Sequence, residues 1–255
     1  MPLCTIHILS LSVPLSTFLS TLSSTSLKPL TISRIIRWII LPSKLSTVPL
    51  LSKNIHWDIL LILPSPSSVP LPELLQIQIS HQWSIEAGVP SRLLKDYEEK
   101  NKRLLKPEQG DVKALTGSLH KLKKGGGKMP HSAQDLELSP ELLNWITEFT
   151  SSNSPSSNGA VSMLNLLAFK PGLKEEYLKY GKAFAESAGS SRGGEAKIVG
   201  SVIKADGEEE WEEMEGRERV GMRSLSRIIR VCGILRICLL VRIIRRRIRG
   251  TGWGV

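Results

Sequence analysis

His56, Trp57 and Asp58 are consecutive residues at the start of "NIHWDILLILP", a segment with the composition of a β-strand. Because alternate residues of a strand face opposite sides, we expect His56 and Asp58 to share a face and Trp57 to point the other way. A histidine beside a carboxylate can move a proton, which makes His56 and Asp58 the catalytic candidates. A hydrogen-bonded pair with a purely structural role at the strand end is the more common arrangement.

Four other residues are candidates for ligand binding. Asn165 lies in the apolar segment "MLNLLAF", where an amide lacking a partner would cost ~1–3 kcal/mol. It therefore either bonds the neighbouring backbone or orients a ligand in a pocket. Tyr177 and Tyr180 either pack in the core or line a cavity. Arg192, in the glycine-rich stretch "SSRGGEA", either belongs to a flexible turn or meets an anionic ligand at a pocket mouth.

No Ser-His-Asp signature, metal-ligand cluster or nucleotide motif stands out in the sequence. The three cysteines, Cys4, Cys232 and Cys238, form no close pair with other metal ligands nearby. This spacing argues against a disulfide framework and against a zinc site. We expect no cofactor and no metal, and the sequence leaves open whether the protein is an enzyme.

The net charge of +10 is confined to one end of the 255-residue chain. The segment from Arg217 to Val255 holds eleven arginines and a single acidic residue, Glu218, and so carries the whole excess. Residues 1–216 are neutral, which gives no reason to expect nucleic-acid binding by the body of the protein. The apolar N-terminus lacks the basic first region of a secretory signal, so we expect a cytoplasmic protein.

The first 90 residues predict a compact α+β unit. "CTIHILSLS" is typical of a strand and "PLSTFLSTLSS" of an amphipathic helix, and two long strands follow in "PLTISRIIRWIILP" and "NIHWDILLILP". "LPELLQIQISHQWSIEAG", residues 71–88, has the length of a helix and a glycine at its end. The predicted order is β-α-β-β-α, the ferredoxin-like order without its last strand.

A polar helical connector is expected over residues 91–149 and a Ser/Asn-rich linker over residues 150–159. In the connector, "SRLLKDYEEKNKRLL" predicts an exposed helix, and Ser139 with Pro140 predicts the start of a helix "PELLNWITEF". Residues 160–206 then repeat the opening pattern, with a strand, an amphipathic helix over residues 172–189 and a second strand. This second ferredoxin-like unit is short of a strand and a helix.

Residues 207–255 combine an acidic run with an arginine-rich tail, "RIIRVCGILRICLLVRIIRRRIRG" at residues 227–250. As protein, the tail suits a basic amphipathic surface helix. It is a poor membrane span, because each central arginine costs ~2.5–3.5 kcal/mol on insertion. Eight arginines in residues 227–250 could enter a core only with charged partners. We therefore expect a loosely attached helix or coil, an open sheet edge beside it, and self-association through that edge.

A third interpretation of the tail is that its codons, from about residue 217, are read out of frame or mis-spliced. Shifted by one base, residues 221–254 can encode a peptide that begins "WDEVALAHYPS" and continues as an amphipathic helix. Its start matches "HWDILLILPS" at residues 56–65 of the first unit. Those two elements, a strand and a helix, are the ones that the second unit lacks.

"AVSMLNLLAFKPG", "YLKYGKAFAE" and "GGEAKIVGSV" resemble the fungal and bacterial proteins of the domain of unknown function 1330 family, in the dimeric α/β-barrel superfamily. "ISRIIRWIILPSKLS" and "NIHWDILLILPS" are similar to the N-terminal half of a longer fungal branch. The resemblance covers residues 3–90 and 159–206 and carries no catalytic signature. It implies two ferredoxin-like units whose sheets face each other around an apolar pocket, here within one chain.

Three functions follow as hypotheses. The first is a protein that binds a small, mostly apolar molecule. The second is a cofactor-independent oxygenase-like or isomerase-like enzyme, which requires His56 and Asp58 to point into the cavity. The third is a binder of membrane surfaces or anionic polymers, which requires the tail to be a genuine part of the protein.

Overall fold

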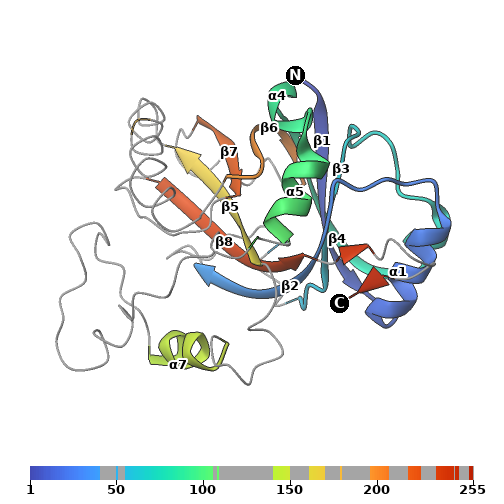
Figure 1. Ribbon diagram of the computed structural model, residues 1–255, viewed down its shortest axis with the longest axis horizontal. Coiled ribbons are helices and arrows are strands. Elements are labelled where there is room, and N and C mark those ends of the chain that lie inside the picture. Colours follow the sequence, from blue (N-terminus) through green and yellow to red (C-terminus); the bar gives the residue numbers. More distant parts are fainter. Residues whose placement is uncertain are drawn as a thin grey trace.

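The computed structural model describes residues 1–40, 50, 55–105, 108, 140–149, 161–169, 179, 196–206, 218–224, 234–243, 245–246 and 253–254. These residues form an α+β structure around one curled antiparallel sheet (Figure 1). Within these ranges, no helix has both the length and the apolar character needed to cross a membrane.

The first half of the chain has the element order β-α-β-β-α-β. Its elements are β1 (Leu3–Leu11), α1 (Leu15–Ser24), β2 (Thr31–Ile40), β3 (Ile59–Leu63), α3 (Glu73–Gln76) and β4 (Ile79–Gly88). The four strands lie side by side in the order β4-β1-β3-β2, and every neighbouring pair is antiparallel.

Two separate apolar cores form, one on each side of this first sheet. On β1, Ile6 and Ile8 belong to an interior cluster, whereas Leu9 faces the opposite side. That opposite side is covered by α1 and α3, which contribute Phe18 and Leu75 to an outer cluster. The strands are therefore buried from both sides, which explains why "ILLIL" in β3 has no polar face.

The prediction of a helix over residues 71–88 is wrong for most of this segment. Only Glu73–Gln76 is helical, and the last ten residues form β4, the strand that the predicted order lacked. The sequence carries a period of two here, with Trp83 and Ile85 in the interior cluster and Ser84 and Glu86 on the other face. Pairing with β1 along its whole length selects the extended form.

The connector contains three described helices: α4 (Ser91–Leu94), α5 (Tyr97–Leu105) and α7 (Pro140–Phe149). α5 is polar as expected, except that Tyr97 at its start is buried in the interior cluster. α7 begins at Pro140 as predicted and touches β2 through Arg37, whose guanidinium lies 2.6 Å from a Glu141 carboxylate oxygen and 5.2 Å from the ring centroid of Trp145.

The second half supplies four more strands, β5 (Val161–Phe169), β6 (Val199–Ala205), β7 (Glu218–Ser224) and β8 (Ile234–Ile243). They lie in the order β8-β5-β7-β6. A separate two-stranded sheet joins β9 (Arg245–Arg246) to β10 (Trp253–Gly254). The helix expected over residues 172–189 falls outside the described residues except for Lys179, which is helical.

The expectation of an incomplete second sheet with a loosely attached tail is therefore wrong. Residues 234–243 pair with β5 over its whole length and with β2 on the other side, and residues 218–224 pair with β5 and β6. The physical reason is that two strand edges with unsatisfied amides and carbonyls accept any segment able to extend. "ILRICLLVRI" is rich in residues that favour strands.

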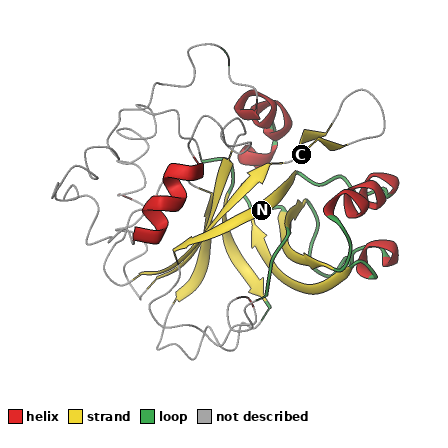
Figure 2. Ribbon diagram, turned by 90° about the horizontal axis from the view of Figure 1, so that it is seen from below, coloured by secondary structure: helices red, strands yellow, loops and turns green. Residues whose placement is uncertain are grey.

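The two halves close on each other through two seams. β2 pairs with β8, and β4 pairs with β6, so the eight strands form a closed barrel in the order β1-β3-β2-β8-β5-β7-β6-β4. Figure 2 shows the strands curled together with helices on the outside. Because each of these strands has a neighbour on both sides, the open edge from which the sequence predicts self-association is covered.

Candidate functional site

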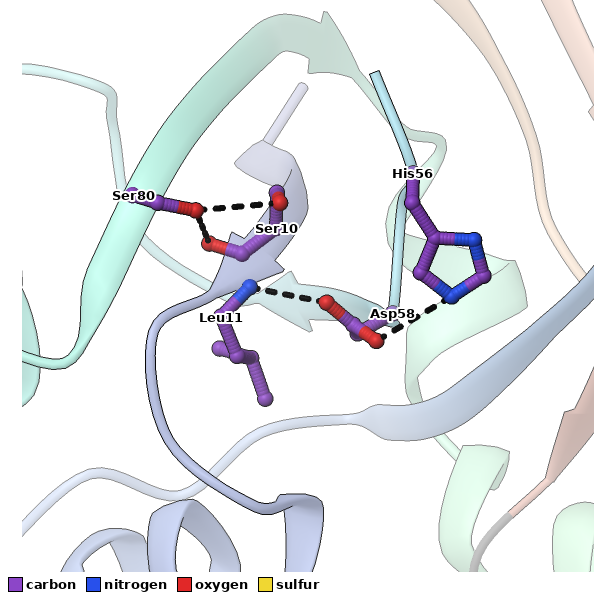
Figure 3. Close-up of polar contacts among 5 residues, drawn as sticks. All are labelled: Ser10, Leu11, His56, Asp58 and Ser80. Atoms are coloured by element: carbon purple, nitrogen blue, oxygen red, sulfur yellow. Dashed lines mark hydrogen bonds and ion pairs between the residues drawn. The ribbon is translucent and has the colours of Figure 1, made fainter.

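His56 and Asp58 precede β3 and lie on the rim of the sheet, not in the barrel interior (Figure 3). The His56 side chain is 89% exposed and its Nε2 is 3.4 Å from Asp58 Oδ1. The second carboxylate oxygen of Asp58 accepts a 2.8 Å hydrogen bond from the backbone N–H of Leu11. Trp57 points the other way, as expected, and its indole N–H donates to the carbonyl of Leu50.

Asp58 has a structural role at a β-bulge. The β1–β4 register shifts between Ser10 and Leu11, and the Asp58 carboxylate serves the backbone N–H of Leu11 at this irregularity. The hydroxyl of Ser80 spans the same irregularity by donating to the Ser10 carbonyl at 3.0 Å (Figure 3). These contacts account for Asp58 without a reaction, and the exposure of His56 gives the enzyme hypothesis no support.

Of the four ligand-binding candidates, only Asn165 lies within the described residues. Asn165 lies on β5 and is buried, between Leu164 and Leu166, which both belong to the interior cluster. Because alternate strand residues face opposite sides, Asn165 faces away from that interior. Tyr177, Tyr180 and Arg192 lie outside the described residues.

A buried histidine on β1 takes part in a polar network on the outer face of the sheet. His7 Nδ1 is 2.9 Å from the hydroxyl oxygen of Ser84, and burial lowers the pKa of His7 to about 4, so the ring is neutral. Asp206 accepts a 2.7 Å hydrogen bond from the backbone N–H of Ser84, and its own backbone carbonyl accepts one from the Trp83 indole. This carboxylate holds β4 beside the end of β6 and does not orient the imidazole as a catalytic triad would.

A second group of buried polar side chains lies where α5 meets the interior cluster. The hydroxyl of Tyr97 is hydrogen-bonded to that of Thr31 on β2, and both residues are buried. Burial raises the pKa of Tyr97 to about 12, so the phenol keeps its proton at neutral pH. Tyr97 thus presents a ring and a hydroxyl at the border of an apolar interior.

Lys197 lies against the same tyrosine. Lys197 is only 6% exposed. Its ammonium lies 5.6 Å from the ring centroid of Tyr97 and donates a 2.5 Å hydrogen bond to the amide oxygen of Asn101 on α5. Burial, together with the nearby charge of Lys100, lowers the pKa of Lys197 to about 8. Perturbed lysines of this kind are concentrated at functional sites.

Two faint signals of this group are present in the sequence. Tyr97 is the one aromatic residue in the charged segment "KDYEEKNKR", and Lys197 interrupts the apolar alternation of "AKIVGSV". Neither signal shows that the two residues meet, because a hundred positions of chain separate them. Among the described residues, no three His, Cys, Asp or Glu side chains are close enough to hold a metal ion.

Comparison with known proteins adds nothing to this geometry. No family model matches the chain, and no match was found among curated proteins or solved structures.

Proposed function

We propose that the protein binds a small, mostly apolar molecule inside a barrel built from two ferredoxin-like halves, as in the dimeric α/β-barrel superfamily. The strand order supports two equivalent halves, because β4-β1-β3-β2 and β8-β5-β7-β6 both place the fourth, first, third and second strands in that sequence. The seams also correspond, since the second strand of each half pairs with the fourth strand of the other.

The observation that carries the proposal is the composition of the barrel interior. Its cluster draws apolar side chains from both halves, including Ile6 of β1, Trp83 of β4, Leu166 of β5 and Val202 of β6. Such an interior favours hydrocarbon over water, at roughly 25 cal/mol for each Å² of apolar surface removed from solvent. The polar groups at its border are few, which is the usual composition of a small-molecule site.

A neutral apolar dye, N-phenyl-1-naphthylamine, tests the proposal on the full chain. Val202 and Ile203 are neighbours on β6, but Val202 is 6% exposed in the interior cluster whereas Ile203 is 41% exposed. Val202→Phe should fill interior space and weaken dye binding about tenfold, and Ile203→Phe is the matched control. Circular dichroism checks that both variants fold, with Ala205→Leu as a milder interior replacement.

Saturable dye binding that only the interior variants weaken is the expected result. Absence of binding to the folded wild-type chain, or equal weakening by Val202→Phe and Ile203→Phe, would contradict the proposal.

The surface-binding hypothesis for the tail remains a separate prediction. Deleting residues 217–255 would not isolate the effect of the charge on binding, because the deletion removes β7 and β8 along with the positive charge. Replacing the arginines of this segment individually is the better design for anionic liposomes. We also propose that the protein is cytoplasmic.

A further inference from the structure

Lys197 is a buried cation whose described contacts supply no negative charge. Its ammonium bonds a neutral amide oxygen, from Asn101, and lies over the neutral ring of Tyr97. Among the described residues, no carboxylate is within ion-pair distance of Lys197. A charge removed from water in this way is costly unless an opposite charge compensates it.

Three described titratable groups lie around Lys197, namely Lys100, Tyr97 and Cys4. Lys100 on α5 adds a second positive charge and donates to the carbonyl of Ala196 at 3.2 Å. Tyr97 stays protonated, and the thiol of Cys4, which raises the pKa of Tyr97, has its own pKa raised by burial. At neutral pH Lys197 therefore carries its positive charge in a partly dehydrated setting.

The position of Lys197 links that charge to the apolar interior. Ile198, the next residue, belongs to the interior cluster, as does Tyr97. Lys197 also ties the second half to the connector, because it lies two residues before β6 while its partner Asn101 lies on α5. A molecule whose hydrocarbon packs against this cluster could bring one anionic group to Lys197.

We infer that the ligand is an amphipathic monocarboxylic acid whose carboxylate pairs with Lys197, an inference that rests on the proposed function. The Asn101 amide oxygen accepts from Lys197, so its NH₂ group remains a second donor for the carboxylate. A charge-assisted hydrogen bond in this partly dehydrated setting is stronger than a neutral one. The acid should therefore bind more tightly than a neutral molecule with the same hydrocarbon chain.

Dodecanoic acid, used below its critical micelle concentration, and dodecan-1-ol, used below its solubility limit, distinguish carboxylate recognition from apolar binding alone. Each displaces N-phenyl-1-naphthylamine from the full chain, and the measured quantity is the ratio of their dissociation constants. Lys197→Met removes the charge and keeps a chain of similar length. Lys204→Met, at an exposed position on β6, is the matched control.

The wild-type protein and Lys204→Met should bind the acid about tenfold or more tightly than the alcohol at pH 7. In Lys197→Met the two ligands should bind with equal affinity, while the alcohol binds as it does to the wild type. Raising the pH above 8 should weaken only the acid, because the ammonium that pairs with it loses its proton.

Two results would overturn the inference and they are distinguishable. Equal preference for the acid in wild type and Lys197→Met would mean that Lys197 only fastens α5 through Asn101, and the proposed apolar site would stand. Failure of both ligands and of the dye to bind the folded protein would remove the proposed function itself.

Discussion

Gly200 of β6 lies so close to the backbone of Gly88 on β4 that a Cβ atom at Gly200 would be 2.9 Å from the Gly88 carbonyl oxygen. This contact lies at one of the two seams where the halves of the chain meet. At Gly88 itself, the nearest neighbour of an added Cβ would be the end of the flexible Met1 side chain, at 3.2 Å, and Ile203 Cδ1 would lie at an ordinary contact distance of 3.5 Å.

These two glycines predict unequal effects of the same substitution. Gly200→Ala should lower the free energy of unfolding by roughly 1–3 kcal/mol, because the backbone of the seam must move apart. Gly88→Ala should have a much smaller effect, because Met1 can turn away. Chemical denaturation of both variants checks this, and equal loss in the two would show that the seam is not closed as described.

Asp58 should matter for stability and His56 should not. Asp58→Ala leaves the backbone N–H of Leu11 without its acceptor at the bulge, which should cost about 1–3 kcal/mol. His56→Ala removes an exposed side chain and should leave the melting temperature unchanged within error. Thermal unfolding of the two variants decides between this structural role and a functional pair, for which both variants would fold equally well.

His7 should make the fold sensitive to mild acid. The pKa of His7 is lowered from 6.5 to about 4 in the folded state, so the unfolded chain binds more protons between these values. Stability linked to His7 is therefore complete above pH 6.5 and is lost as the pH falls toward 4, by up to about 3 kcal/mol.

His7→Gln keeps a hydrogen-bonding side chain opposite Ser84 and removes the titration. Its free energy of unfolding should depend less on pH between 6.5 and 4 than that of the wild type. Parallel pH profiles for the two proteins would show that His7 is not buried as a neutral ring.

The paired hydroxyls of Tyr97 and Thr31 should be coupled. Tyr97→Phe leaves the buried Thr31 hydroxyl without this partner, and Thr31→Val does the same to Tyr97; each should cost about 1–2 kcal/mol. The double variant should be less destabilised than the sum of the two singles. Strict additivity of the three unfolding free energies would contradict a direct hydrogen bond.

The local elements were the predictable part of this fold. β1, α1 and β2 follow from composition and periodicity, because their patterns are long and bounded by proline. The helix predicted over residues 71–88 is wrong at β4, because glutamine and serine beside apolar residues obscure the period of two. Its extended form is decided by pairing with β1, which lies some eighty residues earlier.

The candidate site could not be predicted from local patterns for the same reason. Lys197 meets Asn101 and Tyr97 only because the seam between β4 and β6 brings the residues before β6 beside α5 of the connector. His56 and Asp58 lie two residues apart, so the sequence alone predicts that they pair, but the bulge at Leu11 gives Asp58 a structural partner. The arginine-rich composition of the tail likewise gave no sign that β2 and β5 both offer edges to residues 234–243.

Amide hydrogen exchange on the full chain, resolved within residues 234–243, tests the closed barrel most directly. If β8 is hydrogen-bonded to β2 and β5, amides in this segment should exchange with protection comparable to that of β5, and thus orders of magnitude more slowly than in an unstructured peptide. Exchange of residues 234–243 at the rate of an unstructured peptide, while β1 and β3 remain protected, would show that the tail is outside the sheet and that the barrel is open.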